Sequence, residues 1–489
     1  MKALHYLLCA GLLLPAVTPR ADAQVIRIIH GSREKKAVEL DWLLDEENLF
    51  AMSPDDFEKK AGSKNFVWQD KERTRVRFNP DRFDLKIKDT KVGEVLANFK
   101  GGKLASVAIS VVNKGDDDLI TQSEFTTATD AVRKILSAAS GVKEEPRRKE
   151  EMLSPNGQGA VWRGKKALYV GEWLFLKEKH EEIDGWIWTI KAHGEFVRVR
   201  LLPPQVQLGV QLSKIKTTMT RPQLAANVQR EGNTKAVITG IPMVDQGSKG
   251  YCAVASFERV LRLYGADVDM HDLANAAETY GGTNPQKMKA AIQRMAQKLS
   301  LHTREILFLK SKQFEILFKN YNVLAKKDGK DSVNVNNMSW KDVDPKLLKD
   351  YRASTPEYAK FKQEVVANIN KGIPIMWALE LGMYWEDRID ESFEANRYAV
   401  DKSGGDADAE KDAKEESEEK KKEFDEMKKK NQRPPDYMMG GHMRLIVGYD
   451  TKYSLIYYTD SWGPGHELKS MPIDQAWATT LAMWALEPN

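Results

Sequence analysis

Cysteine is nearly absent from this chain, which has 489 residues but only two cysteines, Cys9 and Cys252. Cys9 lies in an N-terminal segment that we expect to be removed, so the mature chain would hold a single thiol and no internal disulfide. The fold must then be stabilised by its hydrophobic core, for which 42% hydrophobic residues are sufficient. A lone thiol of this kind is either an inert buried side chain or a reactive group.

Long apolar runs are also lacking, apart from one at the N-terminus. That run, residues 7–17 (LLCAGLLLPAV), is too short to span a bilayer, which takes about 20 residues. Lys2 precedes it and Ala21-Asp22-Ala23 follows it, which is the pattern of a secretory signal peptide cleaved after Ala23. The sequence therefore predicts a signal peptide over residues 1–23 and a secreted or periplasmic protein without an integral membrane segment after cleavage.

A large excess of charge and a cluster of metal ligands are absent as well. The net charge of +4 is small for this length and gives no reason to expect a nucleic-acid partner. One mature cysteine and scattered histidines offer no metal-binding cluster, so we expect neither a metal nor another cofactor. The composition favours no particular oligomeric state.

The length favours two domains. Residues 24–202 are rich in strand-like runs, and Gly101-Gly102 separates two of them in the manner of a hairpin turn. An amphipathic helix is predicted over residues 126–140, ending before Gly141. No catalytic motif is present in this half, so we predict a strand-rich α+β domain that is either an accessory domain or a proregion.

The second domain follows a polar stretch, residues 203–235, that predicts a linker. We place this domain over residues 236–489. A charged insertion at residues 384–436 interrupts it, because positions 401–430 hold 12 acidic residues and 9 lysines. Such a segment cannot bury a core, so it is predicted to be a solvated helix or a disordered insertion.

The sequence around Cys252 favours a reactive thiol. Apolar residues recur at helical spacing over residues 252–264 and stop at Gly265, which places Cys252 in the first turn of a helix. The positive end of the helix dipole favours the thiolate, which is the nucleophilic form. Gly247 and Gly250 allow the preceding loop to bend sharply.

A nucleophilic thiol needs a base, and His442 is the best-placed histidine. It opens an apolar strand-like run, and Asp460 ends the next such run after a polar turn at residues 450–452. Antiparallel strands joined in this way would bring His442 and Asp460 to the same end of a sheet. His302, in a short strand-like stretch, is the weaker alternative.

Three blocks in this order resemble the papain-like cysteine peptidases. The stretch QGSKGYCA from Gln246 to Ala253 is similar to the sequence around the family's nucleophile, and HMRLIVGY from His442 to Tyr449 is similar to its histidine strand. The stretch DSWG from Asp460 is similar to the third catalytic block, which is usually Asn-Ser-Trp-Gly. The resemblance implies an α+β papain-like domain with a helical half and an antiparallel β half.

The resemblance also implies catalytic roles for four residues. Cys252 would attack the substrate carbonyl, and His442 would pair with the thiol and protonate the leaving amine. Asp460 would orient the imidazole, and Gln246 would donate a hydrogen bond to the oxyanion together with the backbone N–H of Cys252.

Three further residues are implied at the substrate-binding cleft. Trp462 would shield the pair of His442 and Asp460 from water. Gly281 and Gly282 are similar to a glycine pair that binds the substrate backbone in this family.

The sequence departs from papain at Asp460, where Asn is commoner. Asp occurs there in the relatives that cleave double-glycine leader peptides and in transglutaminases. We predict an exported cysteine peptidase that hydrolyses peptide bonds in protein or peptide substrates through a thioester. The alternatives are a catalytically inactive papain-fold binding protein and an acyltransferase that uses the same triad.

Overall fold

The computed structural model describes residues 36–488, except for 71, 79–82, 114–119, 149–156, 184–185, 209–217, 247–250, 267, 269, 278–288, 290–291, 294–295, 297–300, 336–339, 385–421, 423–424, 431–439 and 464–465. Several predicted features therefore lie outside the described residues. They are the signal peptide over residues 1–23, the glycines Gly247, Gly250, Gly281 and Gly282, and most of the insertion at 384–436.

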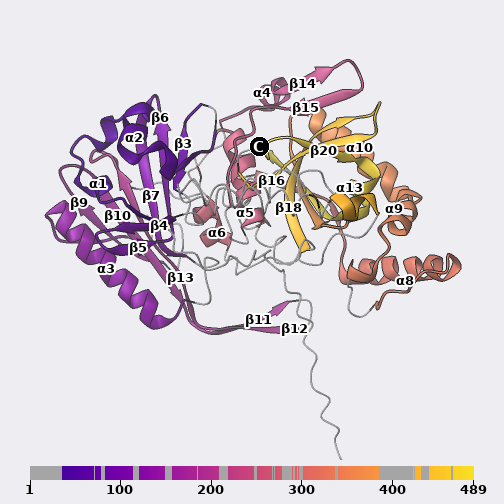
Figure 1. Ribbon diagram of the computed structural model, residues 1–489, viewed down its shortest axis with the longest axis horizontal. Helices are drawn as coiled ribbons and strands as arrows, with labels where there is room; N and C mark the ends of the chain where they lie inside the picture. Colours follow the sequence, from indigo (N-terminus) through magenta and orange to yellow (C-terminus); the bar gives the residue numbers. More distant parts are fainter. Residues whose placement is uncertain are drawn as a thin grey trace, which may run out of the picture.

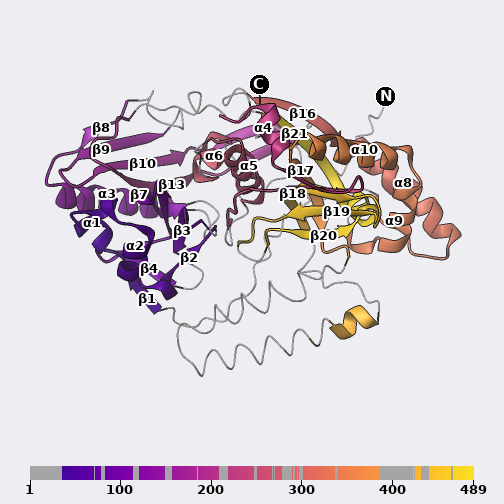
Figure 2. The same ribbon diagram turned by 90° about the horizontal axis from the view of Figure 1, so that it is seen from above.

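The chain is built around two large antiparallel sheets, each with its own hydrophobic core. Figure 1 shows the first sheet at one end of the molecule and the second at the other, and both views place the helices α5 and α6 between them (Figures 1 and 2). Helix and antiparallel strand are thus mixed in both halves, which confirms the predicted α+β class.

The first sheet has eight strands in the order β2-β3-β6-β7-β13-β10-β9-β8. A three-stranded sheet, β1-β4-β5, and the helices α1, α2 and α3 pack around it, and β11 and β12 form a separate pair. The bounds of these elements are β1 Lys36–Glu39, α1 Trp42–Asp45, α2 Pro54–Ala61, β2 Val67–Trp68, β3 Arg75–Phe78, β4 Phe83–Ile87, β5 Thr90–Val92, β6 Glu94–Lys100, β7 Lys103–Asn113, α3 Gln122–Ser140, β8 Glu145–Pro146, β9 Gln158–Arg163, β10 Leu168–Leu176, β11 Lys179–Ile183, β12 Trp186–Ile190 and β13 His193–Leu202.

Two local predictions in this half are confirmed. Strands β6 and β7 pair across Gly101 and Gly102, whose φ angles of 58° and 73° suit the tight turn of a hairpin. Helix α3 ends at Gly141 as expected, but it begins four residues before the predicted start. The side chains of Thr121 and Glu124 form a capping box that extends the helix toward its N-terminus.

The second sheet has the order β14-β15-β18-β17-β21-β16, and β19 and β20 extend it from β18. The predicted linker at 203–235 contains α4 and β14, and β14 pairs with β15 in this sheet. The bounds are α4 Arg221–Ala226, β14 Val228–Glu231, β15 Lys235–Ile238, α5 Cys252–Leu263, α6 Met270–Ala277, β16 Leu301–Phe308, α8 Ser311–Lys327, α9 Pro345–Ala353, α10 Pro356–Asn370, β17 Ile375–Leu381, β18 Gly440–Asp450, β19 Leu455–Thr459, β20 Lys469–Pro472, α13 Ile473–Thr479 and β21 Thr480–Pro488.

Strand β18 is the centre of the second sheet. Residues 442–450 of this strand are all buried, and both α5 and α10 pack against it. None of the helices within the described residues combines the length and the apolar character that a membrane span needs.

Two helices in this half end in the same way. Helices α8 and α10 each finish in a Schellman motif, with Gly329 at φ 66° and Gly372 at φ 73° in the left-handed region. Their surroundings differ, because a Cβ on Gly372 would lie 2.0 Å from the carbonyl oxygen of Leu224, whereas a Cβ on Gly329 would have nothing within 4 Å. The close approach at Gly372 lets α4 lie against the end of α10.

We expect Gly372→Ala to lower the free energy of unfolding by about 3 kcal/mol or more, because it combines left-handed strain with overpacking against α4. The matched variant Gly329→Ala should cost only about 1–2 kcal/mol, since it carries the strain alone. Urea unfolding followed by tryptophan fluorescence compares the two variants. Equal losses would show that α4 does not approach α10 so closely.

Candidate active site

The predicted nucleophile, base and acid come together between helix α5 and strands β18 and β19. Cys252 is the first residue of α5, His442 lies near the start of β18, and Asp460 directly follows β19. Strands β18 and β19 are antiparallel neighbours, with Leu445 opposite Thr459, so the start of one lies beside the end of the other. This confirms the expected juxtaposition of His442 and Asp460.

Helix α5 presents Cys252 at the edge of a buried core. The ten residues 253–261 and 263 are buried, whereas Cys252 keeps part of its surface exposed. The hydroxyl of Ser256, one turn along, donates a 3.4 Å hydrogen bond to the carbonyl oxygen of Met443 and ties the helix to β18. Cys252 thus remains partly exposed while the rest of its helix is fixed.

His442 is held on three sides. Its Nε2 atom lies 2.6 Å from Oδ1 of Asp460, and its ring stacks on Trp462 with centroids 4.6 Å apart and planes inclined by 22°. Cys252 is the third neighbour, close enough for its side chain to raise the pKa of the ring through hydrogen bonding and charge. Since Nε2 is engaged by Asp460, the nitrogen that remains for the thiol is Nδ1.

The environment of His442 favours the charged ring. Burial alone lowers the pKa of His442, but the charge of Asp460 and the hydrogen bonding of the ring with Asp460 and Cys252 outweigh it and raise this pKa from 6.5 to about 9. The imidazolium is thus the dominant form at neutral pH, next to the thiol.

Asp460 is held by residues that the sequence analysis missed. The Nε atom of Arg444 donates a 2.8 Å hydrogen bond to its Oδ2 atom, and neither side chain is exposed. The backbone N–H of Ser461 donates to Oδ1 at 2.9 Å. Arg444 lies two residues beyond His442, and the period of two along a strand could have placed both side chains on one face.

Arg259 fixes the chain at Asp460 and at Pro242. From the middle of α5, its guanidinium donates hydrogen bonds to the carbonyl oxygens of Asp460 (2.5 Å) and Pro242 (2.8 Å) and to the hydroxyl of Thr459 (2.5 Å). Arg259 follows Cys252 by seven residues, a helical spacing that puts both on one face. Its helical spacing from Cys252 was the sequence signal that could have identified it.

Gln246 joins the same site through the residue after the acid. Its backbone N–H donates to the carbonyl oxygen of Ser461 at 2.8 Å, and the hydroxyl of Ser461 donates to its Oε1 atom at 2.6 Å. Because Oε1 accepts this bond, the amide is oriented with its N–H donors on the other side. Sequence analysis had singled out Gln246 but not Ser461.

The remaining candidates are placed as follows. Trp462 covers His442 as expected, and it also meets His466 edge-on with centroids 5.7 Å apart. His302, the weaker candidate base, is exposed on the edge strand β16, which β17 and β21 separate from β18. Within the described residues, no group of three or more histidine, cysteine, aspartate or glutamate side chains could hold a metal ion.

The raised pKa of His442 makes a prediction about stability. Because the folded-state pKa lies above the unfolded value of 6.5, the charged ring stabilises the fold fully below pH 6.5 and this is lost as the pH rises through about 9. We expect His442→Gln to remove a fall of roughly 3 kcal/mol in the free energy of unfolding over this range. Urea unfolding across the range measures it. His302 is exposed, so His302→Gln should retain this fall in stability. If the fall also persisted in His442→Gln, the raised pKa would not belong to His442.

Comparison with known families agrees with this geometry. A profile of the Peptidase C39-like family matches residues 238–486, more than half of the chain. None of the curated proteins compared with the chain matches it significantly. The matched segment contains the three sequence blocks that resemble papain-like peptidases and thereby supports that resemblance. The chain belongs to the Peptidase C39-like family and has a cysteine-peptidase-like fold over this segment.

Proposed function

We propose that the protein is a cysteine peptidase that hydrolyses peptide bonds with Cys252, His442 and Asp460 as its catalytic triad. The observation that carries the proposal is the position of one imidazole, which is hydrogen-bonded to the carboxylate of Asp460 through Nε2 and is close enough to Cys252 for that side chain to raise its pKa. This is the arrangement in which a base is oriented by one group and activates another. Membership of a peptidase-like family supports the same reaction.

In the first half of the reaction, the Cys252 thiolate attacks the carbonyl carbon of the scissile bond. The oxyanion that forms accepts hydrogen bonds from the side-chain amide of Gln246 and the backbone N–H of Cys252. The imidazolium of His442 then gives its proton to the departing amine, and the C–N bond breaks. The acyl group remains on sulfur as a thioester.

In the second half, neutral His442 takes a proton from water, and the resulting hydroxide attacks the thioester. The C–S bond breaks, the carboxylic acid leaves, and the thiolate and imidazolium are restored. Asp460 keeps the ring oriented throughout, and Arg444 keeps the carboxylate itself in place. Trp462 covers one face of the ring, where the lower dielectric strengthens the hydrogen bond between His442 and Asp460.

The architecture that we propose around this site is papain-like. Helix α5 and its neighbours form the helical half, and the sheet centred on β18 forms the β half. We further propose an exported protein in which the signal peptide over residues 1–23 is removed, with the N-terminal α+β domain over 24–202 and the peptidase domain over 236–489.

We expect Cys252→Ala to lower kcat by a factor on the order of 10⁵ or more while the far-UV circular dichroism is retained. His442→Ala should cost nearly as much, because triad members act as a unit, and Asp460→Ala should cost less. His302→Gln, at an exposed histidine on β16 outside the site, serves as the control and should keep near wild-type activity. If Cys252→Ala turned the substrate over at the wild-type rate, the covalent mechanism would be rejected.

The same assay separates the alternatives. Adding a primary amine and analysing products by mass spectrometry distinguishes hydrolysis from acyl transfer, since an acyltransferase would form the amide in preference to the acid. An inactive binding protein would show no turnover, and iodoacetamide would react with its Cys252 no faster than with a free model thiol.

A further inference from the structure

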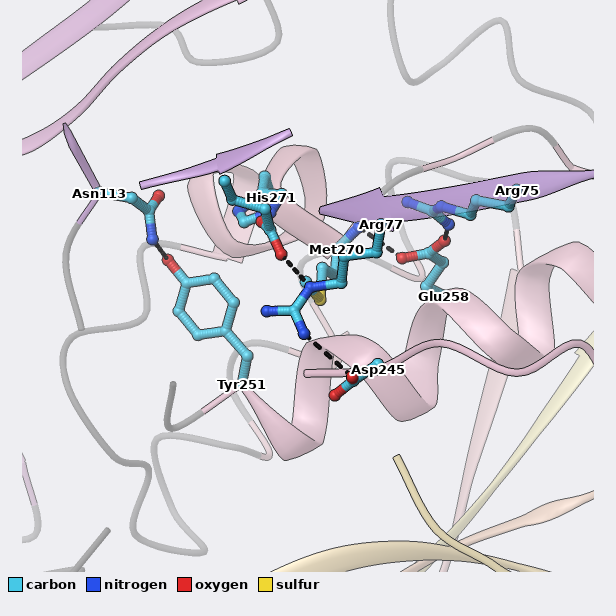
Figure 3. A network of polar contacts seen from close by, with 9 residues as sticks. Arg75, Arg77, Asn113, Asp245, Tyr251, Glu258, Met270 and His271 are labelled. Atoms are coloured by element: carbon cyan, nitrogen blue, oxygen red, sulfur yellow. Dashed lines mark hydrogen bonds and ion pairs between the residues drawn. The ribbon is translucent and has the colours of Figure 1, made fainter. Parts of the chain in front are cut away.

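The face of helices α5 and α6 that is turned away from the second sheet is covered by strands of the first sheet. Figure 3 shows the polar contacts that join them. Strands β3, β6 and β7 supply the side chains on one side, and the segment before α5, helix α5 and the start of α6 supply those on the other. The contacts are Arg75 with Glu258, Arg77 with Asp245 (2.9 Å), Glu94 with His271, and Asn113 with the hydroxyl of Tyr251 (2.7 Å).

This interface is buried and charged. All but one of the eight side chains have exposures of 6% or less, and that of Asp245 is 22% exposed. Within the first sheet, Arg77 is also fixed by Glu94, with Nε and Oε1 separated by 2.5 Å. Charges that are removed from water in this way are stable only while their partners stay in position, so the contacts define one docked arrangement of the two sheets.

Two of these contacts reach residues next to the proposed catalytic groups. Asp245 directly precedes Gln246, and Tyr251 directly precedes Cys252. Arg77 therefore binds the residue beside the oxyanion donor, and Asn113 binds the residue beside the nucleophile.

Asp245 also reaches the loop that follows the acid. A Cβ on Gly463, whose φ is 88°, would lie 3.0 Å from Oδ2 of Asp245, so the carboxylate packs directly on the backbone of that loop. The position of Asp245 is thus coupled to both the oxyanion donor and the segment that carries Asp460 and Trp462.

A third contact with the first sheet is made by α5 itself. Glu258 has no exposed surface, pairs with Arg75 through Oε1, and accepts a 2.7 Å hydrogen bond from the backbone N–H of Met270 through Oε2. Arg75 thereby fixes a carboxylate that joins α5 to the first residue of α6.

An inhibitory proregion would be expected to cover the nucleophile. Cys252, however, keeps part of its surface exposed with strands β3, β6 and β7 in place. The contacts of these strands reach residues near Cys252 in the chain and leave part of its surface exposed.

We propose that the N-terminal domain is a permanent part of the peptidase, in which Arg77 and Asn113 are positioning residues for Gln246 and Cys252. The proposal rests on the proposed function of the triad. Oxyanion donors act only within a narrow distance range, and a displacement of about 1 Å can cost a factor on the order of 100 in rate. Loss of either contact should therefore lower kcat more than it changes KM.

The first experiment compares Arg77→Met with Arg198→Met in the full chain. Arg198 is also a buried arginine of the first sheet, but it pairs with Glu172 of that same sheet, at 2.7 Å. We expect Arg77→Met to lower kcat about 10- to 100-fold with KM changed less than about threefold, whereas Arg198→Met keeps the wild-type kcat. An unchanged kcat in Arg77→Met, an equal loss in Arg198→Met, or a change confined to KM would overturn the proposal.

If Arg77→Met fails to fold, Tyr251→Phe still tests the second contact in a variant that we expect to fold. It removes only the hydroxyl that accepts from Asn113 and keeps the ring, which meets His271 edge-on at 5.7 Å. We expect a smaller loss of kcat, about 3- to 10-fold, and a similar loss in Asn113→Ala. Wild-type kcat in both variants would contradict a role for this contact.

Alkylation of Cys252 by iodoacetamide, mapped by mass spectrometry, separates this proposal from the proposed function. We expect its rate-against-pH profile to change in Arg77→Met and Tyr251→Phe but not in Arg198→Met. If the wild-type protein has no peptidase activity, the proposed function is wrong. The alkylation profiles would still decide whether the N-terminal domain positions the thiol. Identical profiles in all variants would refute the positioning.

The mature, active protein should also retain the N-terminal domain. We expect N-terminal sequencing of the active secreted protein to begin near Gln24. Activity found only in a species that begins near residue 236 would identify a removable proregion and overturn the proposal.

Discussion

The carboxylate of Asp460 is the group on which the geometry of the site depends. It has no exposed surface, and a buried carboxylate is tolerated only when cations and N–H donors surround it. Arg444 supplies a permanent positive charge on one oxygen, and His442 and the backbone of Ser461 occupy the other. The charge of Asp460 and its hydrogen bond to the ring in turn raise the pKa of His442, which favours the imidazolium in a buried position.

Helix α5 connects the surroundings of Asp460 to the proposed nucleophile. Cys252 begins the helix, and Arg259, two turns later, donates to backbone oxygens of both Asp460 and Pro242. A single rigid element thus fixes the thiol, the segment that leads to Gln246, and the end of β19. Relative positions within the site are then set by helix geometry, which varies little, and not by the conformations of three separate loops.

Sequence alone was informative where the determinants are local. The helix at Cys252, the hairpin at Gly101-Gly102 and the adjacency of His442 and Asp460 follow from periodicity and turn chemistry over fewer than about twenty residues. Arg444 and Arg259 were missed because a charged residue in a strand or helix is usually read as solvent-exposed, although their spacing from His442 and Cys252 was visible. The contacts of Arg75 and Arg77 with Glu258 and Asp245 join residues 183 and 168 positions apart, and no local pattern encodes such pairings.

Strand β3 shows why those distant pairings are specific. Val76 and Phe78 point into the core of the first sheet, where Phe78 packs edge-on against Phe57 with centroids 6.2 Å apart. Arg75 and Arg77, on the opposite face, meet α5 and the segment before it, so the strand is buried on both sides. An apolar face there would pack in several registers, whereas two arginines spaced by one pleat repeat require two carboxylates at matching positions. The charged face therefore favours a single docking of the two sheets. This docking sets the positions of the residues beside Gln246 and Cys252.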